Sequence, residues 1–455
     1  MHIQAIVTVA ALALATPLAA QQPLTLQQAL ERAQSGNFGN RMAAAQARAQ
    51  GSSELAALRG ILPTVRIEAG YARTTDPIGA FGTALRQRRI SQQDFDPQRL
   101  NYPDAVDNYT GGVVAEVPLL NVDAHVGRRA AARAADAADA GAQWTSTQTR
   151  VDVIRAYYGA VLAAEKVVTM QAALDAARAH VRQAELMAKA GLVTRSDALL
   201  ADVKTGEIET RLLEAQGELK LAQQGLAILL GEPGTAYELP QLLPGAESVR
   251  ATLEGVTAEI DIEARSDITA ARSGARAAEL DATRATTLYL PRLNGMARYD
   301  WNSATGLYSG DKNWSVGVMA SWTPFAGASE IAERRAAGAR AVAGNAALAA
   351  ARAQADYEVS KASVEREIAL SRLDIAERGL RQSTEAHRII TRKYEGGLAS
   401  VVELLDGAAV ETGARLNFSH ARYTGIVAAA EALKAAGRDP GEVAGQLTST
   451  TVGVR

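Results

Sequence analysis

The stretch AGLVTRSDALLA, at Ala190–Ala201, interrupts a long Ala-rich part of the chain, and a second helix-like segment follows it. The stretch GGLASVVELLDG, at Gly396–Gly407, does the same 206 residues later. Ala-rich text with interspersed charges is typical of long helices whose thin side chains pack closely. In each stretch a Gly permits a left-handed turn, and a Thr or Ser can then cap the returning helix. Both stretches therefore predict the turn of a long helical hairpin.

The offset of 206 residues recurs elsewhere and predicts two internal repeats. The segment RRAA occurs at Arg128–Ala131 and again at Arg334–Ala337. A strand-ending Pro is expected at positions 118 and 324, and a helix-ending Gly at positions 231 and 437. Each repeat is predicted to contain a helix, a strand, a loop, a second strand, a long helix, a tight break and another long helix.

These patterns define the expected boundaries. We predict a signal peptide at 1–20, a first repeat at 21–240, a second repeat at 241–437 and a C-terminal tail at 438–455. Strands are expected near 63–73, 109–118, 291–301 and 314–323, and long helices at 125–189, 196–230, 328–394 and 399–436. A helix of about 65 residues is about 95 Å long, which no compact globule of this size needs. The sequence therefore predicts an elongated coiled assembly.

The N-terminus has the pattern of a secretory signal. An apolar run from Ile3 to Leu18 ends in PLAAQQ, with a cleavage site expected after Ala20. The alternative is a buried N-terminal helix, which the polar Gln21-Gln22 pair disfavours. No later segment has about 18 uninterrupted apolar residues, so a membrane-spanning part would have to consist of strands.

Composition excludes several classes of function. The chain has no Cys, which excludes disulfides, thiolate zinc sites and thiol nucleophiles. Its five His residues include no pair three or four positions apart, so no metal-binding helix face is visible. The formal net charge of −2 gives no field that would attract nucleic acid. No Ser/His/Asp set or phosphate loop is present, and we predict no enzyme activity and no cofactor.

The four predicted strands alternate between an apolar and a polar face. In the first, Val65, Ile67 and Tyr71 oppose Arg66 and Glu68. This alternation over about ten residues is typical of a transmembrane barrel, and the alternative is a soluble sheet with one wet face. Four strands cannot close a barrel, and open edges are not tolerated in lipid. Two chains would supply eight strands, and three would supply twelve and leave room for a pore.

Aromatic residues near the strand ends favour the barrel over the soluble sheet. Amphipathic rings are favoured where the bilayer meets water. The candidates for this membrane interface are Tyr71, Tyr109, Tyr299, Trp301, Trp314 and Trp322.

Taken in order, these motifs resemble those of the TolC family of outer-membrane efflux channels. The matching text covers nearly the whole mature chain: LTLQQALERAQSGN at the start, LP followed by Tyr in Leu62–Tyr71 and Leu290–Tyr299, and VPLLN and TPFAG after the strands. The most specific motif is YEGGLASVVELLDG, at Tyr394–Gly407. Single motifs are loose, but their duplicated order is specific.

The resemblance implies a mixed α and β membrane protein. Three chains would form a 12-stranded β-barrel in the outer membrane of a Gram-negative bacterium, continued by an α-helical coiled-coil tunnel through the periplasm. Such a homotrimer is a passive channel that contacts outer-membrane lipid. It works with a periplasmic adaptor protein and an inner-membrane pump of the resistance-nodulation-division or ABC type. The sequence leaves open the cargo, the adaptor and the choice between drug efflux and type I secretion.

The resemblance also implies a gate at the hairpin tips. Glu403 and Asp406 share one helix face just past the turn, where the family has acidic residues around the periplasmic aperture, and Asp197 is the counterpart of Glu403. Three symmetric copies would attract cations and repel anions. The alternative is an ordinary solvated helix face. Tyr394 matches a family tyrosine that locks the closed tip, whereas the arginine of that lock would fall near Ala399.

The turns themselves are candidates for adaptor contact. Plain turn chemistry explains the Gly and the Thr or Ser at each tip, but it does not explain an exposed Leu at both. The candidate contact residues are Gly191, Leu192, Thr194, Gly397, Leu398 and Ser400. Two other functions stay open from the sequence, a soluble periplasmic coiled coil and a helical enzyme, and the second has only Glu403 and Asp406 as candidates.

Overall fold

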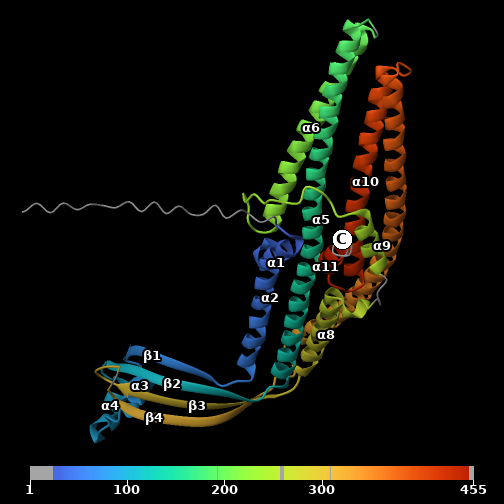
Figure 1. Cartoon of the computed structure of the whole chain (residues 1–455). Helices are drawn as coiled ribbons and strands as arrows, with labels where there is room; N and C mark the ends of the chain where they lie inside the picture. Colours follow the sequence, from blue (N-terminus) through green and yellow to red (C-terminus); the bar gives the residue numbers. More distant parts are fainter. Residues whose placement is uncertain (1–23, 192, 257–260, 308, 450–455) are drawn as a thin grey trace, which may run out of the picture. The chain divides into compact units, whose positions relative to one another are not determined.

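The computed structural model describes residues 24–191, 193–256, 261–307 and 309–449 (Figure 1). The predicted signal peptide lies outside these residues. The chain divides into two compact units. The hairpin unit comprises Met1–Arg41, Ser146–Glu259 and Val359–Arg455, and the sheet unit comprises Met42–Thr145 and Ile260–Glu358. These units do not follow the predicted repeats, because each of them draws segments from both halves of the chain.

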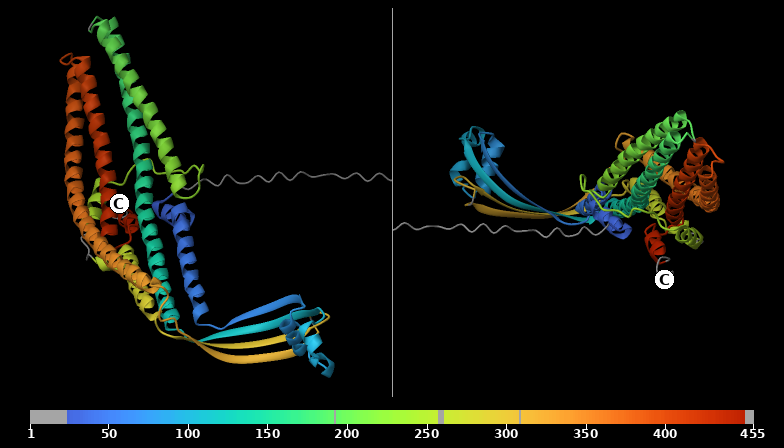
Figure 2. Two further views of the ribbon diagram at one scale, coloured as in Figure 1. Left: turned by 180° about the vertical axis from the view of Figure 1, so that it is seen from behind. Right: turned by 45° about the horizontal axis from the view of Figure 1, so that its top comes forward.

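The hairpin unit contains the turns and the larger part of two long helical hairpins, whose first helices begin in the sheet unit. In the first, α5 (Val122–Lys189) is followed by α6 (Arg195–Leu229), and in the second, α9 (Ser329–Glu395) is followed by α10 (Val401–Ala435). The turns of both hairpins lie at the same end of the unit (Figures 1 and 2). Helices α6 and α10 have the same length, and their bounds differ by 206 residues. The shorter helices of the unit are α1 (Leu26–Gly36), α7 (Ala246–Gly255) and α11 (Glu442–Ser449).

The core of the hairpin unit lies away from the turns, where α1, α7 and α11 pack against the long helices. Ile154, Leu226, Leu253 and Leu433 are fully buried there. A buried ion pair crosses the same region, because the Arg422 guanidinium of α10 donates to the Glu165 carboxylate of α5. The backbone N–H of Leu243 also donates to Glu165, over 2.8 Å. The segment after α6 is thereby fixed to both hairpins.

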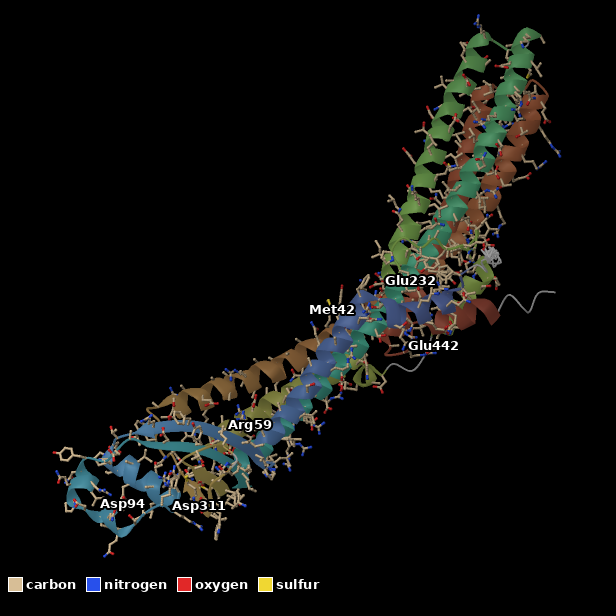
Figure 3. All side chains as sticks on the ribbon, turned by 90° about the vertical axis from the view of Figure 1, so that its left-hand side faces the viewer. Met42, Arg59, Asp94, Glu232, Asp311 and Glu442 are labelled. Carbon is tan, nitrogen blue, oxygen red and sulfur yellow. The ribbon has the colours of Figure 1, made fainter. Side chains whose placement is uncertain are left out.

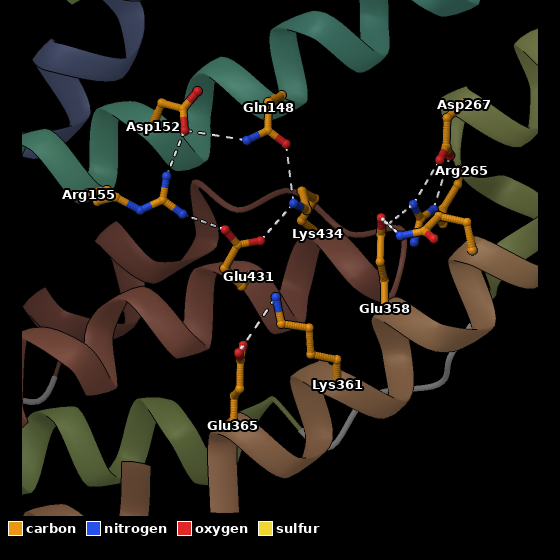
Figure 4. Close-up of polar contacts among 11 residues, drawn as sticks. Gln148, Asp152, Arg155, Arg265, Asp267, Glu358, Lys361, Glu365, Glu431 and Lys434 are labelled. Carbon is orange, nitrogen blue, oxygen red and sulfur yellow. Dashed lines mark hydrogen bonds and ion pairs between the residues drawn. The ribbon is translucent and has the colours of Figure 1, made fainter. Parts of the chain in front are cut away.

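A ring of polar side chains joins the two hairpins directly (Figure 4). Arg155 of α5 donates to Asp152 on its own helix and to Glu431 of α10, over 2.9 and 2.6 Å. Lys434 of α10 contacts Glu431 and donates to Gln148 of α5. Because α5 and α10 are the joined helices, α6 and α9 form the flanks of the unit (Figures 1 and 2).

The sheet unit contains one antiparallel sheet with the strand order β1-β2-β3-β4. Its strands are β1 (Thr64–Thr74), β2 (Val106–Leu120), β3 (Arg292–Ser303) and β4 (Asp311–Ser321). The same unit contains most of α2 (Phe38–Ala57), followed by η1 (Leu58–Gly60), and it also contains η3 (Ile262–Ala264) and α8 (Ser266–Thr287). Arg265, just before α8, is fully buried and bonds to Asp267 and Glu358 (Figure 4).

Two features of the sheet unit differ from the prediction. Strand β2 continues past Pro118 to Leu120, and its pairing with β3 is irregular between those residues. A Pro that cannot donate to the ladder is tolerated there because the ladder is already interrupted. The loop expected at 74–108 contains α3 (Pro77–Arg86), η2 (Gln92–Phe95) and α4 (Pro97–Asn101). Asp76 and Asp96 each precede a Pro and cap these helices.

No helix within the described residues combines the length and the apolar character needed to cross a membrane.

Candidate functional site

The two hairpin turns have the same backbone geometry. Gly191 and Gly397 adopt positive φ angles of 73° and 75°. After α9 the N–H of Gly397 donates to the carbonyl of Tyr394, and the N–H of Leu398 donates to that of Lys393. These two bonds form a Schellman motif, which Gly permits at its left-handed position. The first turn has the equivalent bond from Gly191 to Ala188.

The acidic residues predicted for the gate cap the returning helices. Glu403 accepts hydrogen bonds from the Ser400 N–H and hydroxyl, over 2.7 and 3.0 Å. Asp197 accepts from the N–H and hydroxyl of Thr194, over 3.0 and 2.8 Å. Both are complete capping boxes. The backbone hydrogen bond from Ser400 holds the pKa of Glu403 below its usual value.

The other predicted tip residues lie close to these caps. Asp406 is exposed one turn after Glu403. Leu398 is 82% exposed. Its counterpart Leu192 lies outside the described residues. Arg195 is exposed at the first position of α6.

A small apolar cluster connects the two hairpins just below the turns. It consists of Ala184, Ala201, Tyr394, Val401, Leu404 and Leu405. Tyr394 is 1% exposed, and its hydroxyl has no hydrogen-bond partner among the described residues. Burial raises the pKa of Tyr394, and the charge of Asp197 raises it further. The two tip residues that the resemblance singled out, Tyr394 and Asp197, are therefore close enough to interact.

A polar cluster next to the apolar one was not predicted from the sequence. His387 of α9 contacts the Glu411 carboxylate of α10 over 2.6 Å, and Arg415 and Thr384 donate to the same carboxylate. Burial opposes the charge of Glu411, but these bonds outweigh it and lower its pKa. His180 of α5 has a lowered pKa, because of burial first and of His387 second. The spacing of single residues gave no signal for this cluster, because its members come from three helices.

The predicted interface aromatics share the apolar face of the sheet. Tyr71 pairs with Tyr109, and Tyr299 pairs with Trp314. Trp301 lies opposite Gly111, whose missing side chain leaves room for the indole ring. Trp322 follows the other end of β4. Trp314 and Trp322 are eight residues apart, or about 26 Å along a strand.

The opposite face of the sheet is charged but internally paired. Arg66 of β1 contacts Glu68 and Glu116, and Arg298 of β3 contacts Glu68 and Asp300. Such half-exposed pairs contribute little to stability, but they make this face hydrophilic. One face of the sheet is therefore apolar and the other hydrophilic, as a sheet between an apolar phase and water requires. Among the described residues, no group of acidic and His side chains is arranged to hold a metal ion.

Comparison with known proteins finds a matching family model. Residues 261–438 match the family model described as outer membrane efflux protein. The match covers 178 of the 455 residues, so the similarity to this family is found in the second half of the chain. The description of this family places its members in the outer membrane and assigns them to efflux. A search of curated proteins finds no matching relative.

Solved structures of outer-membrane proteins and channels share the fold over nearly the whole chain. The outer membrane protein VceC of Vibrio cholerae is 19% identical, with a TM-score of 0.72, over 91% of this chain and 96% of that chain. The Campylobacter jejuni channel CmeC is 15% identical, with a TM-score of 0.73, over 90% of this chain and 85% of that chain. The open-state channel MtrE of Neisseria gonorrhoeae is 19% identical, with a TM-score of 0.71, over 91% and 89%. At these identities the similarity concerns the fold.

Proposed function

We propose that three copies of this chain form a passive duct through the outer membrane, with twelve strands in the membrane and twelve long helices in the periplasm. The observation that carries the proposal is the open sheet. Within the described residues β1 and β4 are edge strands without a further partner. Unpaired edges are not tolerated in lipid, so the sheet needs other copies of the chain to close it.

The apolar face of the sheet supports its place in lipid. Val65, Ile67, Trp314 and Val316 are each more than two thirds exposed in the single chain. Such a patch on a soluble protein would be a site of association or aggregation. Aromatic residues at both ends of the patch, about 26 Å apart along the strand, fit an apolar band of about 25 Å with aromatic girdles.

The flanks of the hairpin unit support the same assembly. Large apolar side chains are exposed along both flanking helices, at Leu213, Leu221 and Ile228 on α6 and at Val364, Ile368 and Ile375 on α9. The flank α6 of one copy would pack against the flank α9 of the next, which is a heterologous contact that closes into a ring. A tube of helices follows from the same threefold symmetry as the barrel. The equal lengths of α6 and α10 support two structural repeats within each copy.

We place the periplasmic gate at the hairpin tips. Glu403, Asp406 and Asp197 follow turns of the same geometry, and threefold symmetry would gather three copies of each around the axis. Their negative potential would favour cations where the bore is narrow. The exposed Leu398 and the two turns would form the contact with a periplasmic adaptor, which delivers cargo from an inner-membrane pump.

Cell fractionation and planar-bilayer recording test the duct. The protein is expected in the outer-membrane fraction, and the purified protein is expected to give stable ion-conducting steps. A soluble periplasmic protein that conducts no ions would contradict the proposal and favour a periplasmic coiled coil.

The gate is tested by the double variant Glu403→Gln with Asp406→Asn. Gln at the third helical position keeps the capping box, so the fold is preserved while the charge is removed. The variant is expected to lose cation preference and block by divalent cations in bilayer recordings. The control is Asp202→Asn with Glu214→Gln, which removes the same charge from exposed positions on α6. Unchanged selectivity in the first variant would show that Glu403 and Asp406 do not line the narrow part of the bore.

A further inference from the structure

The segment between β1 and β2 folds over one end of the sheet. Its helices α3 and α4 lie at the end of the sheet that is far from η1 (Figure 1). Figure 3 shows Asp94 and Asp311 at this end, and Arg59 of η1 away from it. Phe81 and Phe95 pack edge to face within the segment, with ring centroids 5.8 Å apart. The segment is therefore a folded piece of structure and not an open loop.

A buried glutamine holds this segment against the sheet. Gln87, directly after α3, is 3% exposed, and its amide donates to the Asp107 carbonyl and to the Asn108 side chain, over 2.8 and 3.0 Å. Asn108 donates in turn to Asn302 of β3, over 3.0 Å. Buried amides that satisfy one another in this way fix the position of a segment more firmly than surface contacts do.

A second attachment reaches the far strand. Arg88 adopts a positive φ of 50°, and its guanidinium donates to the Lys312 carbonyl of β4 over 3.3 Å. The same side chain lies 3.7 Å from the Asp311 carboxylate. The residues after α3 therefore extend from β2 to β4 across the width of the sheet.

The strand register identifies the face that the segment covers. Asn302 pairs with Thr110, and Asp300 pairs with Gly112. Because side chains alternate along a strand, Asn108, Asn302 and Asp300 share the charged face and not the lipid-exposed apolar face. The amide of Asn302 donates to Asp300, over 2.9 Å, so the attachment is continuous with the charged face.

We infer that residues 77–89 form a constriction inside the outer mouth of the barrel, which sets the size of the cargo that can leave. The inference rests on the proposed duct, in which the charged face lines the bore. Gln87 is the positioning residue of the constriction. Three copies, one on each four-stranded third of the barrel, narrow the bore from the wall at a single level.

The absence of Cys from the chain permits a direct test by single-cysteine labelling. Ser315→Cys places a thiol on the charged face of β4, four residues or about 13 Å beyond Asp311. Ser309→Cys places a thiol at the exposed turn between β3 and β4. Intact cells are treated with a small thiosulfonate reagent or with a polymer-linked maleimide that cannot cross the outer membrane.

The small reagent is expected to label both positions, and the polymer reagent is expected to label only Ser309→Cys. Adding Gln87→Ala, or replacing residues 77–101 with a short Gly-Ser linker, is expected to open Ser315→Cys to the polymer reagent. The matched control Gln98→Ala removes an exposed Gln of the same segment and is expected to leave Ser315→Cys protected.

Two results would overturn the constriction. One is polymer labelling of Ser315→Cys as fast as that of Ser309→Cys while the segment is intact. The other is continued protection after the segment has been replaced. Failure of both reagents at Ser309→Cys, with protein absent from the outer membrane, would instead overturn the duct, and the inference with it.

Discussion

The two hairpins have nearly the same backbone but different interiors. In α5 and α6, buried Met170, Leu174 and Leu212 form an apolar cluster between the helices. At the positions 206 residues later, α9 and α10 have Ala376, Leu380 and Phe418, all only half-buried. A pocket lined by Arg372, Gly379, Asn417 and His420 lies between α9 and α10 instead. The second hairpin thus keeps the length and the caps of the first, but its side chains at these three positions are less buried.

The two hairpins also differ in their polar contacts. The His387–Glu411 pair of the second hairpin occupies the positions of Val181 and Thr205 in the first, counted by the same offset. An ionisable pair inside a helical hairpin is costly to bury and sensitive to its protonation state. Two hairpins with nearly the same backbone can therefore differ in stability. We expect the second hairpin to open more easily than the first.

The largest expected effect comes from the apolar cluster. Leu174→Ala is expected to lower the free energy of unfolding by about 2–5 kcal/mol, because it leaves a cavity beside Met170 and Leu212. Leu380→Ala, at the equivalent position of the second hairpin, is expected to cost less than half as much, because Leu380 is only half-buried. Denaturant unfolding in detergent measures both changes. Equal losses would show that the two interiors are equally well packed.

The turns are expected to respond equally. Gly191→Ala and Gly397→Ala each force a side chain into a left-handed backbone conformation, which costs about 1–2 kcal/mol. Among the described residues, neither Gly has a neighbour that an added methyl group would meet, so backbone strain is expected to set the cost. Thermal unfolding of both variants measures it. A clearly larger loss of stability for one variant would show that the two turns are not equivalent.

The smallest effect concerns pH. The pKa of His180 lies below its usual 6.5, so the folded hairpins bind fewer protons than the unfolded chain below pH 6.5. Stability is therefore expected to fall as the pH drops below 6.5. Glu411 adds a second loss at lower pH, as its lowered pKa is crossed. His180→Val should flatten the first decline, whereas the exposed His420→Asn should not. Stability measured between pH 7.5 and 5 gives the answer for both variants.

Much of this comparison could be predicted from the sequence, because it rests on local patterns. A Gly followed by a Thr or Ser specifies each turn through backbone conformation and capping alone. The spacing of Ser400 from Glu403, and of Thr194 from Asp197, also contained the capping boxes, since an acidic residue three positions after the cap is their usual signature. The prediction of a gate takes these acids for their charge alone and leaves out their local role as partners in the capping boxes.

The contacts that were missed depend on distant segments. Gln87 and Asn108 are 21 residues apart, and Asn108 and Asn302 are 194 residues apart, so only the folded sheet brings them together. His180 and His387 are 207 residues apart, one residue away from the repeat offset, and no single-helix spacing reveals them. The helices in the loop at 74–108 were missed although Asp76-Pro77 and Asp96-Pro97 are typical helix starts.

The most direct test of the account is the number of chains in the assembled protein. Native mass spectrometry of the mature protein, released from detergent, is expected to give a mass of three chains and no stable monomer, because three sheets are needed to pair every edge strand around a pore. Bilayer recordings on the same sample would show the conducting steps of that trimer. A monodisperse single chain that conducts ions would contradict the account.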